Sequence, residues 1–393
     1  MTLDKKVVKP TPYYHRAATT LLERYASIYP AVMINGPRQS GKTTLARTTF
    51  PDMPYVSIED FNVQQQIAKD PYEFLARYEM GAIFDEVQHA PQLLSYLQKV
   101  IDERDENGRF IITGSQNFAL SQTVTQSLAG RVGQITLLPL SVQELGSTLS
   151  PLELALQGGY PRLHKNNMLP HEFYPSYIGN YIERDVRQIK NIGDLTQFQN
   201  FLLLCAGRTG QLLNINALAQ DCGIAQTTAQ KWLTVLEASY IIFRLKPYHN
   251  NFNKRLTKQQ KLYFYDTGLA ASLLNVQTAE QLTSHFARGA LFENLIVLEV
   301  LKNRLNRGIP PHLYFWRDSA GREVDLIDEW TGQISAFEIK SSQTFQPDDT
   351  KGLAYFAGLA PNVATYVLYG RKQAGAYGIV QLIALEDVEE VLK

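Results

Sequence analysis

The sequence predicts an α/β protein built from three units, and three patterns along the chain lead to that prediction. Between residues 31 and 113, short apolar runs alternate with helical segments, which indicates a parallel sheet covered on both faces. From Leu212, two helical segments separated by Gly223 precede two strand patterns. From Arg288 the order is helix, three strands, helix and strand. The predicted domains span residues 1–155, 156–280 and 281–393.

Composition limits the possible classes of protein. The chain has 393 residues, of which 45% are hydrophobic and 19% charged, and its formal net charge is zero, so any contact with nucleic acid has to be local. The first residues lack the apolar core of a signal peptide, and no run approaches the ~18 apolar residues that span a bilayer. We therefore expect a cytoplasmic protein without a membrane partner. Two cysteines, Cys205 and Cys222, are too few for a zinc site.

The most specific motif follows the first predicted strand, residues 31–34. Gly36 is followed by four residues, by Gly41-Lys42-Thr43 and by a helical pattern, which is the complete phosphate-binding loop in its strand-loop-helix setting. Lys42 is expected to reach the β and γ phosphates of ATP, and Thr43 to ligate Mg²⁺. The predicted ATP-binding residues are Gly36, Pro37, Arg38, Gln39, Ser40, Gly41, Lys42, Thr43, Thr44 and Asp85.

A pair of carboxylates ends the apolar run 82–84. Asp85 is expected to hold Mg²⁺ through water, and Glu86 to polarise the attacking water, as in ATPases that hydrolyse their nucleotide. An Asp-Glu pair can also be a solvated strand end, but its position one strand-helix unit after the phosphate loop favours the catalytic interpretation.

Two further segments carry candidates for catalysis. The strand 110–112 precedes Ser115 and Asn117, either of which could orient the water, although a turn without a catalytic role is the alternative. Arg131 could stabilise the transferring phosphoryl group in the same subunit or in a neighbour of a homo-oligomer. A surface salt bridge is the alternative for this arginine.

These motifs together resemble a known family. GPRQSGKTT, AIFDEVQ, IITGSQN, LAGRV and LPLSVQEL look like the AAA-type predicted ATPases of bacteria and archaea. Their usual C-terminal companion is a domain of unknown function, which the chain resembles in GGYPR, YIERDV, KLYFYDTGL, FEN, WRDSAGREVD and FEIKSS. The resemblance implies a P-loop ATPase that uses ATP and Mg²⁺.

The middle segment has the pattern of a winged helix. The candidate recognition helix, residues 227–236, contains Lys231 as its one base, which is thin for neutralising DNA phosphates. Bases gather on the expected wing loop instead, at Lys254, Arg255, Lys258 and Lys261. Contact with DNA and a structural or partner-binding use both remain open. Asp266 is expected to cap the next helix.

The C-terminal segment resembles the core of the PD-(D/E)XK nucleases, a restriction-endonuclease-like α/β domain. If Thr331 and Gly332 form a two-residue hairpin loop, Asp325 lies opposite Glu338, with Lys340 on the same face as Glu338. Their carboxylates and the Ile339 carbonyl suit Mg²⁺ or Mn²⁺, and Lys340 would hold or deprotonate the attacking water. The resemblance adds Glu293 as a fourth residue. The alternative is the solvated face of a hairpin.

Two functions follow from these patterns. One is ATP-controlled processing of DNA or RNA by a metal-dependent nuclease. The other is an ATP-dependent switch whose C-terminal domains bind a protein partner and cut nothing. The metal-binding pattern favours the first function, and the neutral charge with the weakly basic recognition helix favours the second.

Overall fold

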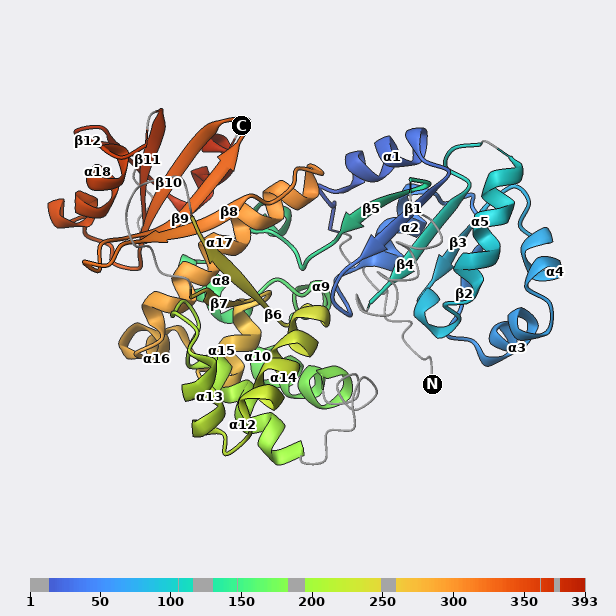
Figure 1. The fold of residues 1–393 in the computed structure, drawn as a ribbon, viewed down its shortest axis with the longest axis horizontal. Helices are drawn as coiled ribbons and strands as arrows, with labels where there is room; N and C mark the ends of the chain where they lie inside the picture. The colour runs from blue at the N-terminus through green and yellow to red at the C-terminus, as the bar shows by residue number, and fades with distance from the viewer. Residues whose placement is uncertain are drawn as a thin grey trace, which may run out of the picture.

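The computed structural model describes residues 14–104, 106–115, 130–146, 148–182, 195–248, 259–360, 362–370 and 375–392. Its first unit is a five-stranded sheet of order β2-β3-β4-β1-β5, in which every pair is parallel (Figure 1). The predicted parallel sheet is therefore confirmed. Its strands are β1 (Ala31–Asn35), β2 (Tyr55–Ser57), β3 (Ala82–Asp85), β4 (Phe110–Gly114) and β5 (Val132–Thr136).

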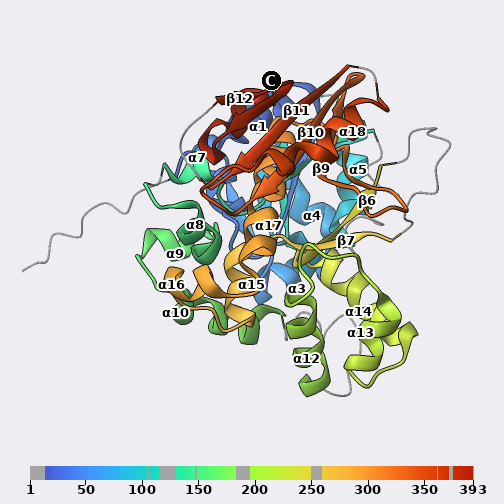
Figure 2. The ribbon, with the colours of Figure 1, turned by 90° about the vertical axis from the view of Figure 1, so that its left-hand side faces the viewer.

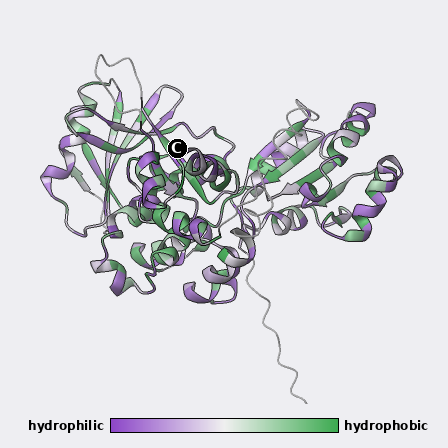
Figure 3. Ribbon diagram, turned by 60° about the horizontal axis from the view of Figure 1, so that its bottom comes forward, coloured by the Kyte–Doolittle hydropathy of each residue, from purple (hydrophilic) through white to green (hydrophobic). Residues whose placement is uncertain are grey.

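Helices cover both faces of this sheet. Met33 and Phe84 face one core, while Val32 and Ile34 face the other, which is the alternation that a strand buried on both sides produces. The surrounding helices are α1 (Thr19–Ile28), α2 (Lys42–Thr49), α3 (Phe61–Lys69), α4 (Pro71–Ala76), the 3-10 turn η1 (Val87–His89) and α5 (Leu93–Glu103). Hydrophobic residues lie on the strands, and hydrophilic residues colour the outer helices (Figure 3).

The middle unit is mainly helical. Within it, α13 and α14 meet at a turn where Gly223 has a φ of +65°, and the antiparallel pair β6 and β7 follows. Asp266 accepts a hydrogen bond from the Leu269 amide and caps α15, as predicted. The elements are α7 (Val142–Leu145), α8 (Pro151–Gln157), α9 (Pro161–Lys165), α10 (Pro170–Tyr177), η2 (Ile178–Ile182), α12 (Leu195–Ala206), α13 (Ile215–Asp221), α14 (Gln226–Ala238), β6 (Ile242–Pro247), β7 (Lys261–Phe264), α15 (Thr267–Leu273) and α16 (Ala279–Ser284).

The C-terminal unit has the predicted order of elements. Strands β9 and β10 pair antiparallel around Thr331 and Gly332, with Phe337 opposite Leu326, so the register is the one that the hairpin loop predicts. Strand β11 runs parallel to β10. The elements are α17 (Arg288–Asn306), β8 (Leu313–Arg317), β9 (Glu323–Trp330), β10 (Gln333–Lys340), η3 (Pro347–Thr350), α18 (Lys351–Ala357), β11 (Val363–Tyr369), β12 (Gly375–Tyr377), β13 (Val380–Ile383), η4 (Leu385–Asp387) and α19 (Val388–Val391).

One sheet joins the middle and C-terminal units. Its order is β12-β13-β11-β10-β9-β8-β6-β7, and the join is a parallel pairing of Lys246 and Pro247 with Tyr314 and Phe315. Helix α17 lies beneath this sheet and above α15 (Figure 2). The sheet therefore runs across the boundary that the sequence suggested at residue 280.

Candidate functional site

The phosphate loop connects β1 to α2 and needs glycine at two positions. Gly36 has a φ of +148°, and a Cβ on it would lie 2.2 Å from the Leu137 carbonyl oxygen. Gly41 has a φ of +97° and immediately precedes α2. Only glycine adopts both conformations without strain, and the amino end of α2 directs its free N–H groups at the loop. The backbone therefore forms an anion-binding turn.

Lys42, the first residue of α2, is 4% exposed. Its ammonium donates to the carbonyl oxygens of Gly36 at 3.1 Å and Pro37 at 2.8 Å. Burial lowers the pKa of Lys42 to about 8, against the charges of Glu86 and Asp85. Nearby, the buried Ser40 hydroxyl has no hydrogen-bond partner within the described structure. A buried cation held by backbone carbonyls beside an unused hydroxyl fits a phosphate group.

Asp85, at the end of β3, receives hydrogen bonds from three hydroxyl groups. Thr43 donates at 2.7 Å, Thr113 at 2.5 Å and Tyr55 at 2.9 Å. These donors hold the carboxylate in place, but none of them neutralises its charge. A fixed carboxylate beside a threonine hydroxyl is the oxygen-rich environment that Mg²⁺ prefers, so Thr43 and Asp85 fit the metal of an ATP complex.

Glu86 follows in the left-handed conformation, with a φ of +57°. Its amide donates to the Thr113 hydroxyl at 3.0 Å, while Ser115 donates to its carboxylate at 2.9 Å and Gln88 also donates to it. Burial alone would raise the pKa of Glu86, but the charge of Lys42 and these side-chain hydrogen bonds lower it below its usual value. Glu86 is therefore an oriented, ionised carboxylate, as a general base has to be.

The other predicted catalytic residues of the ATPase unit are Ser115, Asn117 and Arg131, and of those that the structure describes only Ser115 lies at the site. Ser115 lies beside Glu86, whereas Asn117 lies outside the described residues. Arg131 lies at the amino end of the strands, where its carbonyl accepts from Ala31, and its guanidinium pairs with Asp102 at 2.5 Å. About 15 Å of β1 separates it from the phosphate loop. Arg131 therefore does not reach the phosphate loop of its own subunit, and the prediction that it acts there is wrong.

Sequence reasoning missed several residues around this site. Thr113, Tyr55 and Gln88 contact the two carboxylates. Thr113 had a usable signal, because it ends the strand beside β3, and the carboxyl ends of neighbouring parallel strands meet at one edge. Tyr55 and Gln88 had no local pattern that would distinguish them.

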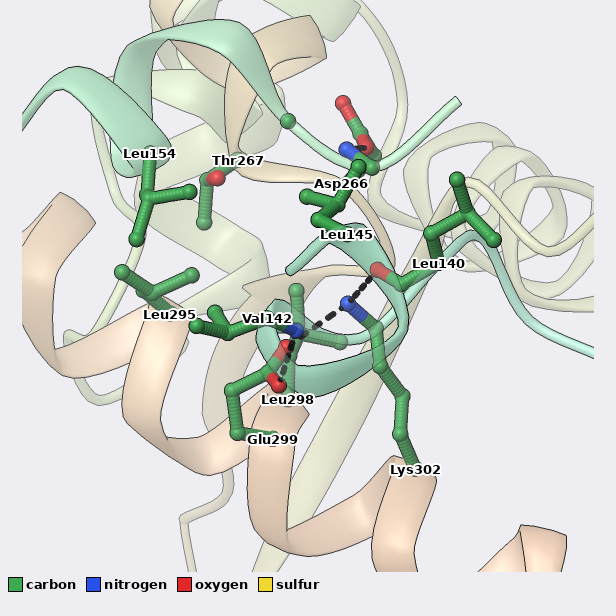
Figure 4. A pocket seen from close by; sticks show the side chains of 12 residues that line it. Leu140, Val142, Leu145, Leu154, Asp266, Thr267, Leu295, Leu298, Glu299 and Lys302 are labelled. Carbon is green, nitrogen blue, oxygen red and sulfur yellow. Dashed lines mark hydrogen bonds and ion pairs between the residues drawn. The ribbon is translucent and has the colours of Figure 1, made fainter. Parts of the chain in front are cut away.

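A network of buried polar groups joins the phosphate loop to the rest of the molecule. Arg16 donates to the Ser40 and Leu138 carbonyls at 2.7 Å each and pairs with Glu144 at 3.0 Å. Helix α17 contacts the neighbouring backbone, as Figure 4 shows. Glu299 accepts from the Val142 amide at 2.7 Å, and Lys302 donates to the Leu140 carbonyl at 2.8 Å. Helix α17 is therefore hydrogen-bonded to the backbone of residues 140–142, the segment that follows the ATPase sheet.

The GGYPR motif forms the other side of this junction. A Cβ on Gly158 would lie 2.2 Å from the Tyr174 hydroxyl and 2.4 Å from Asp266. Asp266 accepts from Tyr174 at 2.7 Å and from the Gly159 amide at 2.8 Å, and burial raises its pKa. The cavity in Figure 4 is only about 10 Å³, which is room for a single water. The described side chains and backbone at this junction are therefore closely packed, and they leave no space for a ligand.

Of the four basic residues predicted on the wing loop, the structure describes one, Lys261. Lys254, Arg255 and Lys258 lie outside the described residues. Lys261 begins β7 and is 3% exposed, so its assignment to a solvated loop is wrong. Its ammonium lies 2.8 Å from Glu293, 2.5 Å from Glu323 and 3.7 Å from Asp325.

The predicted C-terminal metal site has a different arrangement. Asp325 accepts a hydrogen bond from the Ile339 amide at 2.8 Å, where the sequence suggested that the Ile339 carbonyl would share a metal ion with it. Glu338 pairs with Lys340 at 2.5 Å, and burial together with the charge of Asp325 raises the pKa of Glu338 to about 8. Among the described residues, no group of three or more His, Cys, Asp or Glu could hold a metal ion.

Three parts of the chain match known domain families. Residues 29–146 match an AAA domain, residues 150–280 a domain of unknown function (DUF8612), and residues 288–387 another domain of unknown function (DUF4143). Within the described residues, no helix has the length and apolar character needed to cross a membrane.

Similar proteins cover most of the chain. An uncharacterized protein of Mycobacterium tuberculosis is 32% identical over 332 residues, which are 84% of this chain and 74% of that protein. An uncharacterized protein of Haemophilus influenzae is 20% identical over 302 residues, 69% of this chain and 74% of that protein. A Walker-type ATPase of Pyrococcus abyssi, at 14% identity and a TM-score of 0.47, covers 68% of this chain and 99% of its own. The chain belongs to the family of its mycobacterial relative and carries a P-loop ATPase domain of the AAA type followed by a DUF4143 domain.

Proposed function

We propose that the chain is a Mg²⁺-dependent ATPase that acts as a switch, its ATP cycle controlling what the middle and C-terminal units bind. The observation that carries the proposal is the position of Glu86. This ionised carboxylate is fixed by Ser115 and Gln88 and lies next to Asp85, the residue that Thr43 contacts. These are the parts that hydrolysis of a phosphoanhydride requires.

Each residue has one role in this proposal. Bound ATP and Mg²⁺ would supply the phosphoanhydride and the charge that polarises it. Lys42 would bind phosphate oxygens, and Thr43 and Asp85 would hold the metal. Glu86 would orient a water molecule and accept its proton. The Thr113 hydroxyl donates to the Asp85 carboxylate and accepts from the Glu86 amide, so one side chain holds both residues in position.

The switch is favoured over a nuclease by the charge balance of the C-terminal unit. Three of its carboxylates contact the buried ammonium of Lys261, so they already have a cation. The route for control is the segment 138–142, which Arg16 ties to the phosphate loop and α17 ties to the C-terminal unit. A change at the loop therefore has a direct path of contacts to α17.

Nucleic-acid binding is the second candidate. The outer face of α14 exposes Gln226, Thr227, Gln230 and Lys231. Glutamine can read adenine, but one lysine neutralises few phosphates. We therefore propose a protein partner ahead of DNA or RNA.

The first experiment compares ATP hydrolysis by wild type and Glu86→Gln. The substitution removes the proton acceptor and keeps the shape, so turnover should fall by about 10²- to 10⁴-fold while ATP affinity is retained. Glu338→Gln, the same change at the C-terminal site, is the matched control and should hydrolyse ATP normally. Full turnover by Glu86→Gln would remove the role assigned to Glu86.

The second experiment separates the switch from the nuclease. Wild-type protein is incubated with single- and double-stranded DNA and RNA, with Mg²⁺ or Mn²⁺, with and without ATP. The switch predicts no cleavage under any condition. Cleavage that Asp325→Asn abolishes and that leaves ATP hydrolysis intact would establish the nuclease instead.

A further inference from the structure

The C-terminal carboxylates converge on a lysine that comes from the middle unit. Glu293 projects from α17, and Glu323 and Asp325 from β9, while Lys261 lies on β7. The Lys261 ammonium is 2.8 Å from Glu293 and 2.5 Å from Glu323, with Asp325 at 3.7 Å. The first two contacts are close ion pairs, whereas Asp325 lies beyond hydrogen-bond distance and acts on the ammonium through its charge.

The lysine is fixed where it lies. Its strand pairs with β6, where Lys261 lies opposite Leu245, and on the other side it bridges to Leu212. The flanking residues are held as well, because the Leu262 amide donates to the Gln211 carbonyl and the Leu262 carbonyl accepts from the Gly210 amide. The backbone is therefore anchored from two directions, and the side chain points into the carboxylates.

The surroundings favour a permanently charged lysine. Tyr263 donates to Glu293 at 2.5 Å, and the Phe315 ring centre lies 5.6 Å from the ammonium. Burial alone would lower the pKa of Lys261, but Tyr263 and the three carboxylates raise it well above its usual value. Gathered carboxylates require a cation or a proton nearby, and here the chain supplies the cation itself.

The second lysine of this region has a different partner. Lys340, which the sequence suggested would handle a catalytic water, pairs with Glu338 and is 35% exposed. Lys261 therefore lies among Glu293, Glu323 and Asp325, whereas Glu338 keeps one buried carboxylate oxygen, Oε2, that has no hydrogen-bond partner among the described residues.

We propose that Lys261 is a built-in counter-ion that takes the place of a divalent metal among Glu293, Glu323 and Asp325, so that this cluster binds neither Mg²⁺ nor Mn²⁺. The same contacts fasten β7 of the middle unit to α17 and β9. The nuclease-like hairpin thus retains the carboxylates of a metal site and uses them as an anchor between units.

The test is Lys261→Met, which removes the ammonium and keeps the length of the side chain. In nucleotide-free protein with EDTA, its unfolding temperature should fall by roughly 10 °C, because the carboxylates lose their cation. Mn²⁺ should then restore a substantial part of the loss, because it can occupy the vacated position. Wild type and Lys261→Arg should show no such response to Mn²⁺.

Lys302→Met is the matched control. Lys302 is also buried, but it pairs with the single carboxylate Glu299. This variant should lose stability that Mn²⁺ does not restore, since one carboxylate forms no metal site. A folded Lys261→Met protein that ignores Mn²⁺, or a Lys302→Met protein that Mn²⁺ restores equally, would overturn the proposal.

A measurement on wild type decides the matter if Lys261→Met does not fold. Electron paramagnetic resonance counts the Mn²⁺ bound by nucleotide-free wild type and by Asp325→Asn. Equal binding by the two proteins supports the proposal, because the cluster then contributes no site. Mn²⁺ that wild type binds and Asp325→Asn does not would show that the cluster holds metal with Lys261 in place.

Discussion

The ATP site and the C-terminal cluster both place carboxylates at neighbouring elements, but they balance the charge differently. Asp85 is surrounded by the hydroxyl groups of Thr43, Thr113 and Tyr55, which are neutral. Asp325 lies with Glu293 and Glu323 around an ammonium. A neutral shell leaves the charge for a cation from solution, whereas an internal lysine satisfies it within the chain.

The two buried lysines show the same contrast from the other side. Lys42 and Lys261 are 4% and 3% exposed. Burial lowers the pKa of Lys42 to about 8, because its direct partners are carbonyl groups, whereas the neighbours of Lys261 raise its pKa despite burial. Burial is nearly the same for both lysines and therefore does not show which of them has a ligand-binding role. Their partners do, because Lys42 contacts carbonyl groups and Lys261 contacts carboxylates. Lys42 is ready to receive a phosphate, while Lys261 has its anions already.

The largest effect expected from this contrast is that of Lys42→Ala. It should reduce ATP affinity by about 100-fold or more, because a buried charged donor to the phosphates is lost. Titration calorimetry with ATP and Mg²⁺ measures the change, and Lys340→Ala, a lysine of the other site, should bind ATP as wild type does. Equal losses in the two variants would break the comparison.

A smaller effect should appear in the pH dependence of stability. The pKa of Glu338 is raised to about 8 by burial, by Asp325 and by Glu323, with Lys340 opposing them. A raised carboxyl pKa gives stability that is complete below the usual value of 4.5 and is lost as pH rises through 8. The unfolding temperature should therefore fall between about pH 5 and pH 8.

The variant that checks this is Glu338→Gln, in which the fall with pH should be shallower. Glu86 has the opposite sign, since its lowered pKa gives stability that is lost only as pH falls. Burial raises the pKa of Glu293 to about 7, so this residue adds a slope of the same sign. Calorimetric unfolding across this range, with Glu86→Gln as the control, measures the share of the slope that belongs to Glu338. An unchanged slope in Glu338→Gln would contradict the assignment.

The smallest effect is expected for Arg131→Ala. Its partner Asp102 is exposed at the far end of the sheet, so turnover of ATP should stay within about twofold of wild type. Asp102→Asn should behave alike. A large fall in turnover that depends on protein concentration would indicate instead that Arg131 acts on a neighbouring subunit.

The sequence revealed most where the necessary residues are close together in the chain. The phosphate loop is contiguous, and the register of β9 and β10 follows from the hairpin loop at Thr331 and Gly332. Arg131 could have been placed better, because it precedes β5, and sites of parallel sheets lie at the carboxyl ends. The buried position of Lys261 could not have been predicted, because it depends on α17 and β9, whose contacting residues follow it by some thirty residues or more.

The sheet that runs from β12 to β7 makes the stability of the two C-terminal domains interdependent. The matched domains end at residue 280 and begin again at residue 288, yet their strands hydrogen-bond side by side. Melting either half removes hydrogen-bond partners from the other, so the two should unfold in one cooperative step. The parallel sheet is complete by Thr136 and shares no strand with them, so its own strand pairings do not depend on theirs.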